Sequence, residues 1–192
     1  MKVVAFNGSP RKDGNTSVLL EEVLAVLQRE GIETELVHLS GAISGCIACS
    51  KCFENKDGKC AFDKDAINEY IEKMAEADGI VLGSPTHFAD LTPALKALID
   101  RAGFVGIANG GMFMRKVGAA VVAVRRAGAI HVFDSINHFF LISQMIVPGS
   151  SYWNIGLGLG ERDVENDAEG LKTMRALGEN MAWLMKRINA QA

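Results

Sequence analysis

Residues 2–17 read KVVAFNGSPRKDGNTS. Lys2 to Phe6 is a short apolar run with β-branched residues that ends in a glycine turn, which predicts a buried strand. From Thr16 onward apolar residues recur at helical spacing, and Gly31 is the predicted end of that helix. A buried strand, a glycine-rich loop and a helix in this order are typical of a parallel α/β sheet.

The rest of the chain continues this alternation. Further strands are predicted over 34–39, 79–83, 117–124 and 146–148, and further helices over 66–77, 93–102, 130–142 and 168–188. Between them lie a cysteine-rich irregular insert at 40–62 and a glycine-rich loop at 149–166. Five strands and five helices predict a single α/β domain over 1–192, with a parallel sheet of order 2-1-3-4-5.

Composition and charge exclude several classes of function. The 192 residues are 48% apolar and 22% charged, with a formal net charge of -3. This balance does not indicate binding to nucleic acid or to an anionic membrane. The opening apolar run is too short for a signal peptide, and no stretch approaches the ~20 apolar residues that span a bilayer. We therefore expect a cytoplasmic protein with reduced cysteines.

The loop after the first predicted strand is suited to bind an anion. Its backbone amides lead into a helix N-terminus, where unpaired N–H groups and the helix dipole favour negative charge. Hydroxyl, amide and guanidinium donors are concentrated in the same segment, and charged donors bind phosphate oxygens strongly. The predicted phosphate-binding residues are Ser9, Arg11, Asn15, Thr16 and Ser17.

Two other kinds of phosphate-binding loop are excluded. A Walker A loop has the spacing G-x-x-x-x-G-K-[ST], whereas here five residues separate Gly8 from Gly14 and Asn15 stands in place of the lysine. The dinucleotide fingerprint G-x-G-x-x-G is also absent. The alternative interpretation is a tight strand–helix turn in which Asn15 or Thr16 only caps the helix.

A second motif follows the third predicted strand, where residues 83–101 read GSPTHFADLTPALKALIDR. Together with GSPRKDGNTS at 8–17, it resembles the NADPH-dependent FMN reductase family of the flavodoxin-like superfamily, over about residues 2–150. The resemblance implies a flavodoxin-like three-layer sandwich and an FMN phosphate held by the loop residues named above. It also implies that the isoalloxazine ring is lined by Pro85, Thr86, His87 and Phe88.

The chemistry of this second loop agrees with that implication. Pro85 stiffens the backbone, and the remaining amides can face the pyrimidine edge of a flavin. His87 and Phe88 offer flat faces for stacking, although relatives usually carry Tyr where His87 stands. Without the motif around it, His87 would be read as an ordinary histidine of a surface loop.

Two arginine-containing segments complete the candidate site. Arg125 follows the predicted strand 117–124, and it is a candidate to contact the flavin edge or a phosphate of NADPH. A solvated basic turn is an equally consistent interpretation of that loop. Asp100-Arg101 ends the helix predicted over 93–102, where we expect it to brace a neighbouring loop or subunit without a chemical role.

All the cysteines of the chain fall within one short segment, with the spacing Cys46-x2-Cys49-x2-Cys52-x7-Cys60. Four thiolates suit a cubane iron-sulfur cluster or a structural zinc ion. Zinc sites more often pair two CxxC motifs far apart in sequence, so this compact pattern favours iron and sulfur. A metal-free cysteine loop that serves packing or an oligomer contact is the remaining alternative.

The cysteine motif resembles that of the iron-sulfur flavoprotein branch of the same family. The resemblance implies a 4Fe-4S cluster that passes electrons to FMN. Because the insert follows the strand predicted over 34–39, we expect such a cluster on the flavin side of the molecule.

The combined interpretation is an FMN-dependent oxidoreductase that takes electrons from NAD(P)H or ferredoxin and passes them to a small-molecule acceptor. The first alternative is an NAD(P)H:quinone or flavin reductase with an inert cysteine loop. The second is a non-catalytic electron carrier of the flavodoxin type. We also expect a homo-oligomer, a dimer or a tetramer, because Tyr152 and Trp153 lie in the loop predicted over 149–166 and the resemblance implies assembly.

Overall fold

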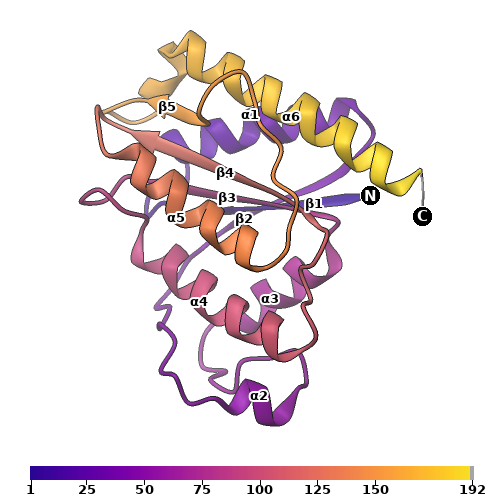
Figure 1. Cartoon of the computed structure of the whole chain (residues 1–192). Coiled ribbons are helices and arrows are strands. Elements are labelled where there is room, and N and C mark those ends of the chain that lie inside the picture. Colours follow the sequence, from indigo (N-terminus) through magenta and orange to yellow (C-terminus); the bar gives the residue numbers. More distant parts are fainter. Residues whose placement is uncertain (191–192) are drawn as a thin grey trace.

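A five-stranded parallel sheet with the order β2-β1-β3-β4-β5 forms the centre of the molecule (Figure 1). The computed structural model describes residues 1–190. The α/β class and the strand order predicted from the sequence are confirmed. The strands are β1 (Lys2–Asn7), β2 (Glu33–His38), β3 (Gly79–Pro85), β4 (Val117–Val124) and β5 (Ile155–Leu157).

Helices cover both faces of the sheet and give the molecule three layers. On one face lie α1 (Asn15–Arg29) and α6 (Ala168–Asn189). On the other face lie α3 (Ile67–Glu76), α4 (Pro93–Ala108) and α5 (Ala129–Ile142). Two short elements complete the set, α2 (Lys51–Asn55) and the 3-10 helix η1 (Asp163–Asn166). Among the helices of residues 1–190, none is long and apolar enough to cross a membrane.

The central strands are buried on both faces, which explains why they read as continuous apolar runs. Every residue of β4 is buried. Its side chains alternate between the two cores, so that Val121 packs with α1 and α6 whereas Val122 packs with α3, α4 and α5. The strands therefore hold the two helical layers together along their whole length.

The last strand is the part of the sheet that the sequence predicts wrongly. Instead of a strand at 146–148, the structure has a single parallel bridge between Ile146 and Val117. The ladder resumes as β5 at the far end of β4, inside the loop predicted over 149–166. Between the two, the side-chain Nδ2 of Asn154 donates to the Ala120 carbonyl at 2.9 Å and replaces a backbone donor.

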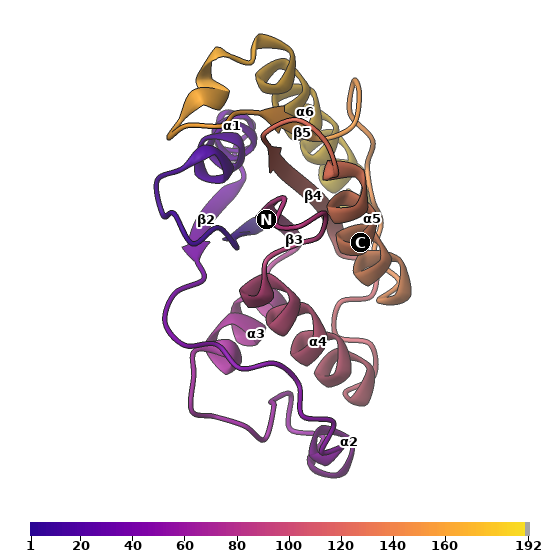
Figure 2. The same cartoon turned by 90° about the vertical axis from the view of Figure 1, so that its left-hand side faces the viewer.

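The cysteine-rich insert leaves the carboxyl end of β2 and extends past the sheet along α4 (Figure 2). It is irregular as predicted, except for the short helix α2. This helix packs on α4, with the rings of Phe53 and Phe104 in edge contact at 6.4 Å between centroids. The insert therefore rests on the outer side of α4 rather than on the sheet.

Candidate functional site

A pocket opens at the carboxyl edge of the sheet, where the loops after β1, β3 and β4 meet. This edge pocket has a cavity volume of about 380 Å³, within the range typical of small-molecule sites. It is lined by most of the residues predicted to bind a cofactor: Ser9, Arg11, Asn15, Thr16, Pro85, Thr86, His87 and Arg125. Ser17 and Phe88 do not line it. Gly158 and Leu159, which follow β5, line it without having been predicted.

The loop after β1 is shaped by side chains that sequence reasoning missed. The Asn7 carboxamide accepts from the Ser9 N–H at 2.9 Å and donates to the Lys12 carbonyl at 3.0 Å. From the end of β2, His38 Nε2 lies 2.8 Å from the Ser9 carbonyl oxygen. These contacts fix the backbone of the loop before any ligand binds.

Gly8 allows this loop to approach β3 and α4 closely. Its N–H donates to the Gly83 carbonyl at 2.8 Å, and its carbonyl accepts from the Thr92 hydroxyl at 2.7 Å. A Cβ at this position would lie 2.9 Å from the Leu95 Cβ, which is closer than side-chain carbons pack. Glycine at position 8 is therefore required by the packing of the loop against β3 and α4.

The start of α1 presents unpaired donors to the edge pocket. Its N-cap is Gly14, and no side chain caps the helix, so the first N–H groups lack intrahelical partners. The Thr16 hydroxyl is buried and has no hydrogen-bond partner among the described residues. A buried hydroxyl is costly to leave unpaired, so this atom indicates a missing polar ligand.

Two of the predicted phosphate-binding side chains are engaged elsewhere. Asn15 Nδ2 donates to the Gly160 carbonyl at 2.9 Å, and its Oδ1 accepts from the Val164 N–H at 3.1 Å. The Ser17 hydroxyl donates to the Glu21 carboxylate at 2.8 Å. Asn15 therefore joins the start of α1 to the loop after β5, and Ser17 stabilises the first turn of the helix.

The loop after β3 forms the second wall of the pocket. The Thr86 N–H donates to the Ala123 carbonyl at 2.9 Å, and its hydroxyl is a second buried group without a partner among residues 1–190. His87 and Asp90 close a tight turn through paired backbone hydrogen bonds. Phe88 lies at the tip of this turn with a φ of 45°, and its ring is fully exposed. Phe88 therefore does not line the edge pocket, and its expected contact with the isoalloxazine ring stays a prediction.

Two positive charges border the edge pocket. Arg11 lies on the phosphate-type loop and Arg125 directly follows β4. Neither has a salt-bridge partner within the described part of the chain. Their charges are therefore available to an anionic ligand.

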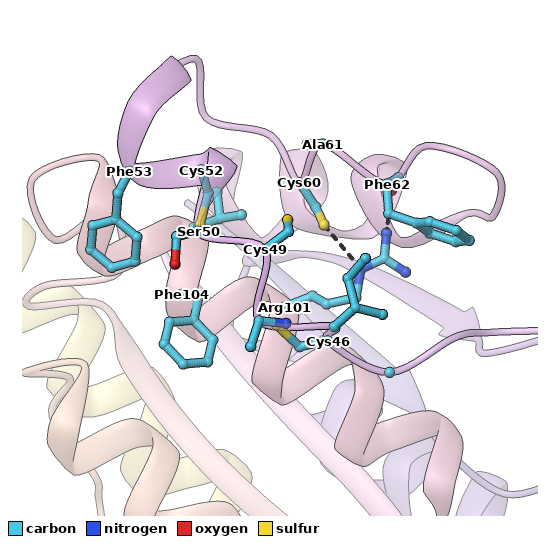
Figure 3. A pocket seen from close by; sticks show the side chains of 14 residues that line it. Cys46, Cys49, Ser50, Cys52, Phe53, Cys60, Ala61, Phe62, Arg101 and Phe104 are labelled. Atoms are coloured by element: carbon cyan, nitrogen blue, oxygen red, sulfur yellow. Dashed lines mark hydrogen bonds between the residues drawn. The ribbon is translucent and has the colours of Figure 1, made fainter.

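A second pocket is formed by the insert, and all four cysteines line it (Figure 3). This cysteine pocket is closed on one side by Arg101, Phe104 and Val105 of α4. Cys46 and Cys49 are exposed, whereas Cys52 and Cys60 are half-buried. Burial raises the pKa of the Cys52 thiol, and the nearby Cys60 and Cys46 raise it further.

The four thiols are not arranged for a single ion. Within residues 1–190, no three Cys, His, Asp or Glu side chains are close enough together to hold one metal ion. The pocket also shares no lining residue with the edge pocket. Arg101 lies eight residues beyond Pro93, or about 12 Å along α4. The cysteine pocket is therefore separate from the edge pocket, and the expectation that a cluster in it lies on the flavin side of the molecule stays a prediction.

Arg101 joins the insert to α4, as the sequence predicts for a bracing residue. It is 1% exposed and pairs with Asp65. Although burial would raise the pKa of Asp65, hydrogen bonds from Arg101 bring it below its ordinary value. Asp100 does not share this function, because it pairs with Lys96 on the exposed side of its own helix.

The model of one protein family, described as NADPH-dependent FMN reductase, matches residues 1–160. The chain belongs to this family. It is 41% identical to an iron-sulfur flavoprotein of Methanocaldococcus jannaschii, over 98% of this chain and 99% of that relative.

Solved structures show that the chain has the flavodoxin-like fold. RosB, solved with a bound 8-demethyl-8-formylriboflavin-5'-phosphate, superposes with a TM-score of 0.74 at 20% identity, over 99% of this chain and 81% of that one. A WrbA-like flavodoxin from Agrobacterium tumefaciens gives a TM-score of 0.66 at 13% identity, over 97% of both chains. At these identities the likeness shows the fold alone.

The edge pocket fits the FMN that the family implies. The uncapped start of α1, the unpartnered Thr16 hydroxyl and the charge of Arg11 match the needs of a terminal phosphate. The unpartnered Thr86 hydroxyl lies in the other wall, where a ring with polar edges would meet it. Both buried hydroxyls that lack partners in this pocket are therefore explained by one ligand.

The cysteine pocket fits a polynuclear group better than a single ion. In a 4Fe-4S cluster each thiolate binds a different iron, so the ligand sulfurs stand farther apart than around one metal. Four cysteines around one apolar pocket match that donor set. The pocket is the feature of this chain that FMN binding leaves unexplained.

Proposed function

We propose that this chain is an FMN-dependent oxidoreductase that holds FMN in the edge pocket and a 4Fe-4S cluster in the cysteine pocket. The observation that carries the proposal is the lining of one pocket by every cysteine of the chain. The family supplies the flavin part of the argument, and the name of the Methanocaldococcus relative supports the cluster.

The protein residues would bind and orient the flavin. Arg11, Thr16 and the N–H groups at the start of α1 would hold the phosphate, while Pro85, Thr86 and His87 would line the ring. Arg125 would lie at the ring edge or bind a phosphate of NADPH. Bound FMN would supply two-electron chemistry, taking a hydride from NAD(P)H or two single electrons from ferredoxin and passing two electrons to an acceptor.

A groove next to the edge pocket is a candidate binding site for a small-molecule electron donor or acceptor. It has an empty volume of about 1020 Å³ and shares Pro10 and His87 with the edge pocket. His38 and Ile43 line its other side. A nicotinamide or a small acceptor in this groove would therefore reach the proposed flavin from the insert side.

A second candidate function is an NAD(P)H-dependent flavin or quinone reductase with an inert cysteine loop. The observation that favours it is that the described cysteines do not converge on one metal ion. In that case NAD(P)H oxidation would be the same in Cys49→Ala as in the wild type. A flavodoxin-type electron carrier, by contrast, would not oxidise NAD(P)H in steady state.

The test is anaerobic purification and reconstitution with iron and sulfide, followed by an absorption spectrum and by iron, sulfide and FMN analysis. We expect one FMN and about four irons per chain. Flavin bands without iron would leave the FMN assignment intact and favour the second candidate. Absence of flavin from the purified protein, with no binding of added FMN, would overturn both.

A further inference from the structure

Arg101 makes an unusual set of contacts beneath the cysteine pocket. Its Nε donates to Cys60 Sγ at 3.3 Å, and its Nη2 donates to the Phe62 carbonyl (Figure 3). Its Nη1 contacts both carboxylate oxygens of Asp65, at 2.6 and 2.8 Å, and the Ser44 carbonyl at 3.1 Å. A guanidinium holds its donors in a fixed plane, so these contacts set the position of the Cys60 sulfur relative to α4.

Cys60 is also fixed through its backbone. The Asn68 side chain accepts from the Cys60 N–H at 2.8 Å and donates to the Cys60 carbonyl at 2.9 Å. Asn68 lies on α3 and Arg101 on α4, so two separate helices position this one cysteine. Among the described residues, no other cysteine sulfur accepts a hydrogen bond from a side chain.

The charge around this contact is balanced. The Asp65 side chain is 4% exposed and that of Arg101 is 1% exposed, so the pair is a buried ion pair. A buried arginine without a counter-ion would be costly, and Asp65 supplies the counter-ion. The pair thereby keeps an N–H donor aimed at a thiol sulfur without leaving an uncompensated charge in the interior.

We propose that Arg101 is a positioning residue for the cluster, one that holds the Cys60 sulfur in place and raises the reduction potential of the bound iron-sulfur group. This proposal rests on the cluster proposed above. Hydrogen bonds to cluster sulfurs and nearby charge both set the potential of such groups. Reduction adds negative charge, which an N–H donor and a guanidinium stabilise, and which the Asp65 carboxylate opposes.

The experiment compares three variants with the reconstituted wild type. Arg101→Lys keeps the charge opposite Asp65 but lacks the planar donor set, so it cannot serve Cys60 and Asp65 together. Asp65→Asn keeps the Nε donor to Cys60 and removes the negative charge. Lys96→Gln is the control, because Lys96 is an exposed cation on the same helix. FMN content and circular dichroism report whether each variant is folded.

The deciding measurement is the midpoint potential of the cluster. It is obtained from a redox titration in which electron paramagnetic resonance reports the reduced cluster. We expect a lower potential in Arg101→Lys, a higher potential in Asp65→Asn, and no change in Lys96→Gln. A merely structural brace would not shift the potential in opposite directions. Unchanged potentials in folded Arg101→Lys and Asp65→Asn, or shifts of the same sign, would overturn the proposal.

The iron content of each reconstituted sample distinguishes the remaining outcomes of the experiment. If the wild type takes up iron and neither Arg101→Lys nor Asp65→Asn does, then the pair is a structural brace and the effect on potential is refuted. If the wild type itself takes up no iron, the proposed cluster is wrong and the proposal for Arg101 falls with it. The FMN content of the same samples shows whether the flavin part of the proposed function survives.

Discussion

Single side chains decide what the edge pocket can bind, and Thr16 is the most informative of them. Its hydroxyl is buried at the start of α1 and has no partner within residues 1–190. An unpaired buried hydroxyl lowers the stability of the free protein and becomes useful only when a ligand accepts its hydrogen bond. The effect of this hydroxyl on the stability of the free protein and its effect on ligand binding have opposite signs, and the two can be measured separately.

We predict that Thr16→Val weakens FMN binding about tenfold, which corresponds to about 1.4 kcal/mol, the order of one hydrogen bond to a charged group. The FMN-free protein should be equally stable or slightly more stable, because valine removes the unpaired hydroxyl and keeps the shape. Titration calorimetry and denaturant unfolding check the two halves. Ser17→Ala is the control for binding, since that hydroxyl already donates to Glu21. Equal FMN affinity in Thr16→Val and wild type would contradict the phosphate assignment.

Arg11 should contribute through its charge. We predict that Arg11→Ala weakens FMN binding by about 1.5–3 kcal/mol, the value of a charge-assisted hydrogen bond, with the lower end expected because Arg11 is exposed. The loss should shrink at high salt. Lys12→Ala is the matched control, because Lys12 is a neighbouring exposed cation that does not line the pocket. An affinity loss of the same size in both variants would show a general charge effect instead.

At the scale of elements, the edge strand β2 is tied to its neighbours by Glu35. The Glu35 carboxylate accepts from Lys73 of α3 at 2.6 Å and pairs with Lys2 of β1 at 2.9 Å. The hydrogen bonds from Lys73 and then Lys2 lower the pKa of Glu35 below its ordinary value of 4.5. A lowered carboxyl pKa stabilises the fold above the ordinary value, and that stabilisation is lost as pH falls through the folded-state value.

We predict that Glu35→Gln lowers the free energy of unfolding at pH 7, and that the difference from the wild type shrinks as the pH falls below 4.5. Denaturant unfolding at pH 7 and at progressively lower pH measures this difference. Glu72→Gln is the control, since Glu72 of α3 is exposed and has no ion pair within the described chain. If the difference in unfolding free energy between Glu35→Gln and the wild type stays constant across this pH range, the stabilising role of the Glu35 ion pairs is contradicted.

The elements differ in how well the sequence predicts them, for physical reasons. β4 is an unbroken apolar run, and burial on both faces makes that pattern unmistakable. β5 has only three residues with a glycine at its centre, too short for any periodicity to appear. The contacts of His38 and Asn68 join an element to an irregular loop through a single side chain, so the periodicity of the sequence does not predict them. The sequence predicts that Arg101 braces a neighbouring loop, but it does not predict that Cys60 is one of its partners.

At the scale of the whole molecule, the exposed aromatic rings near β5 predict assembly. Tyr152 and Trp153 are 68% and 52% exposed, and their rings lie together at 6.2 Å between centroids. Leu157 and Leu159, in and just after β5, are also exposed, by 52% and 63%. An apolar surface of this kind at a sheet edge is better covered by a second copy than left to water.

We predict that light scattering at micromolar concentration reports a particle larger than the 20.6 kDa chain. Trp153→Glu, which places a charge in the apolar surface, should shift the population toward the monomer. Trp183→Glu is the control, because Trp183 is comparably exposed but lies on α6. A wild-type particle of monomer mass would refute the assembly, and equal dissociation by both variants would refute this surface as its site.

The two hydrogen bonds of Asn15 also constrain when the flavin site can form during synthesis. They connect the start of α1 to Gly160 and Val164, about 145 residues later in the chain. The N-terminus of a chain leaves the ribosome first, and folding begins during synthesis. Contacts between residues far apart in the sequence form late. A nascent chain that already holds β1, α1 and β3 still lacks the loop that fastens Asn15. We therefore expect the flavin site to be complete only after the segment that holds Gly160 and Val164 has been translated.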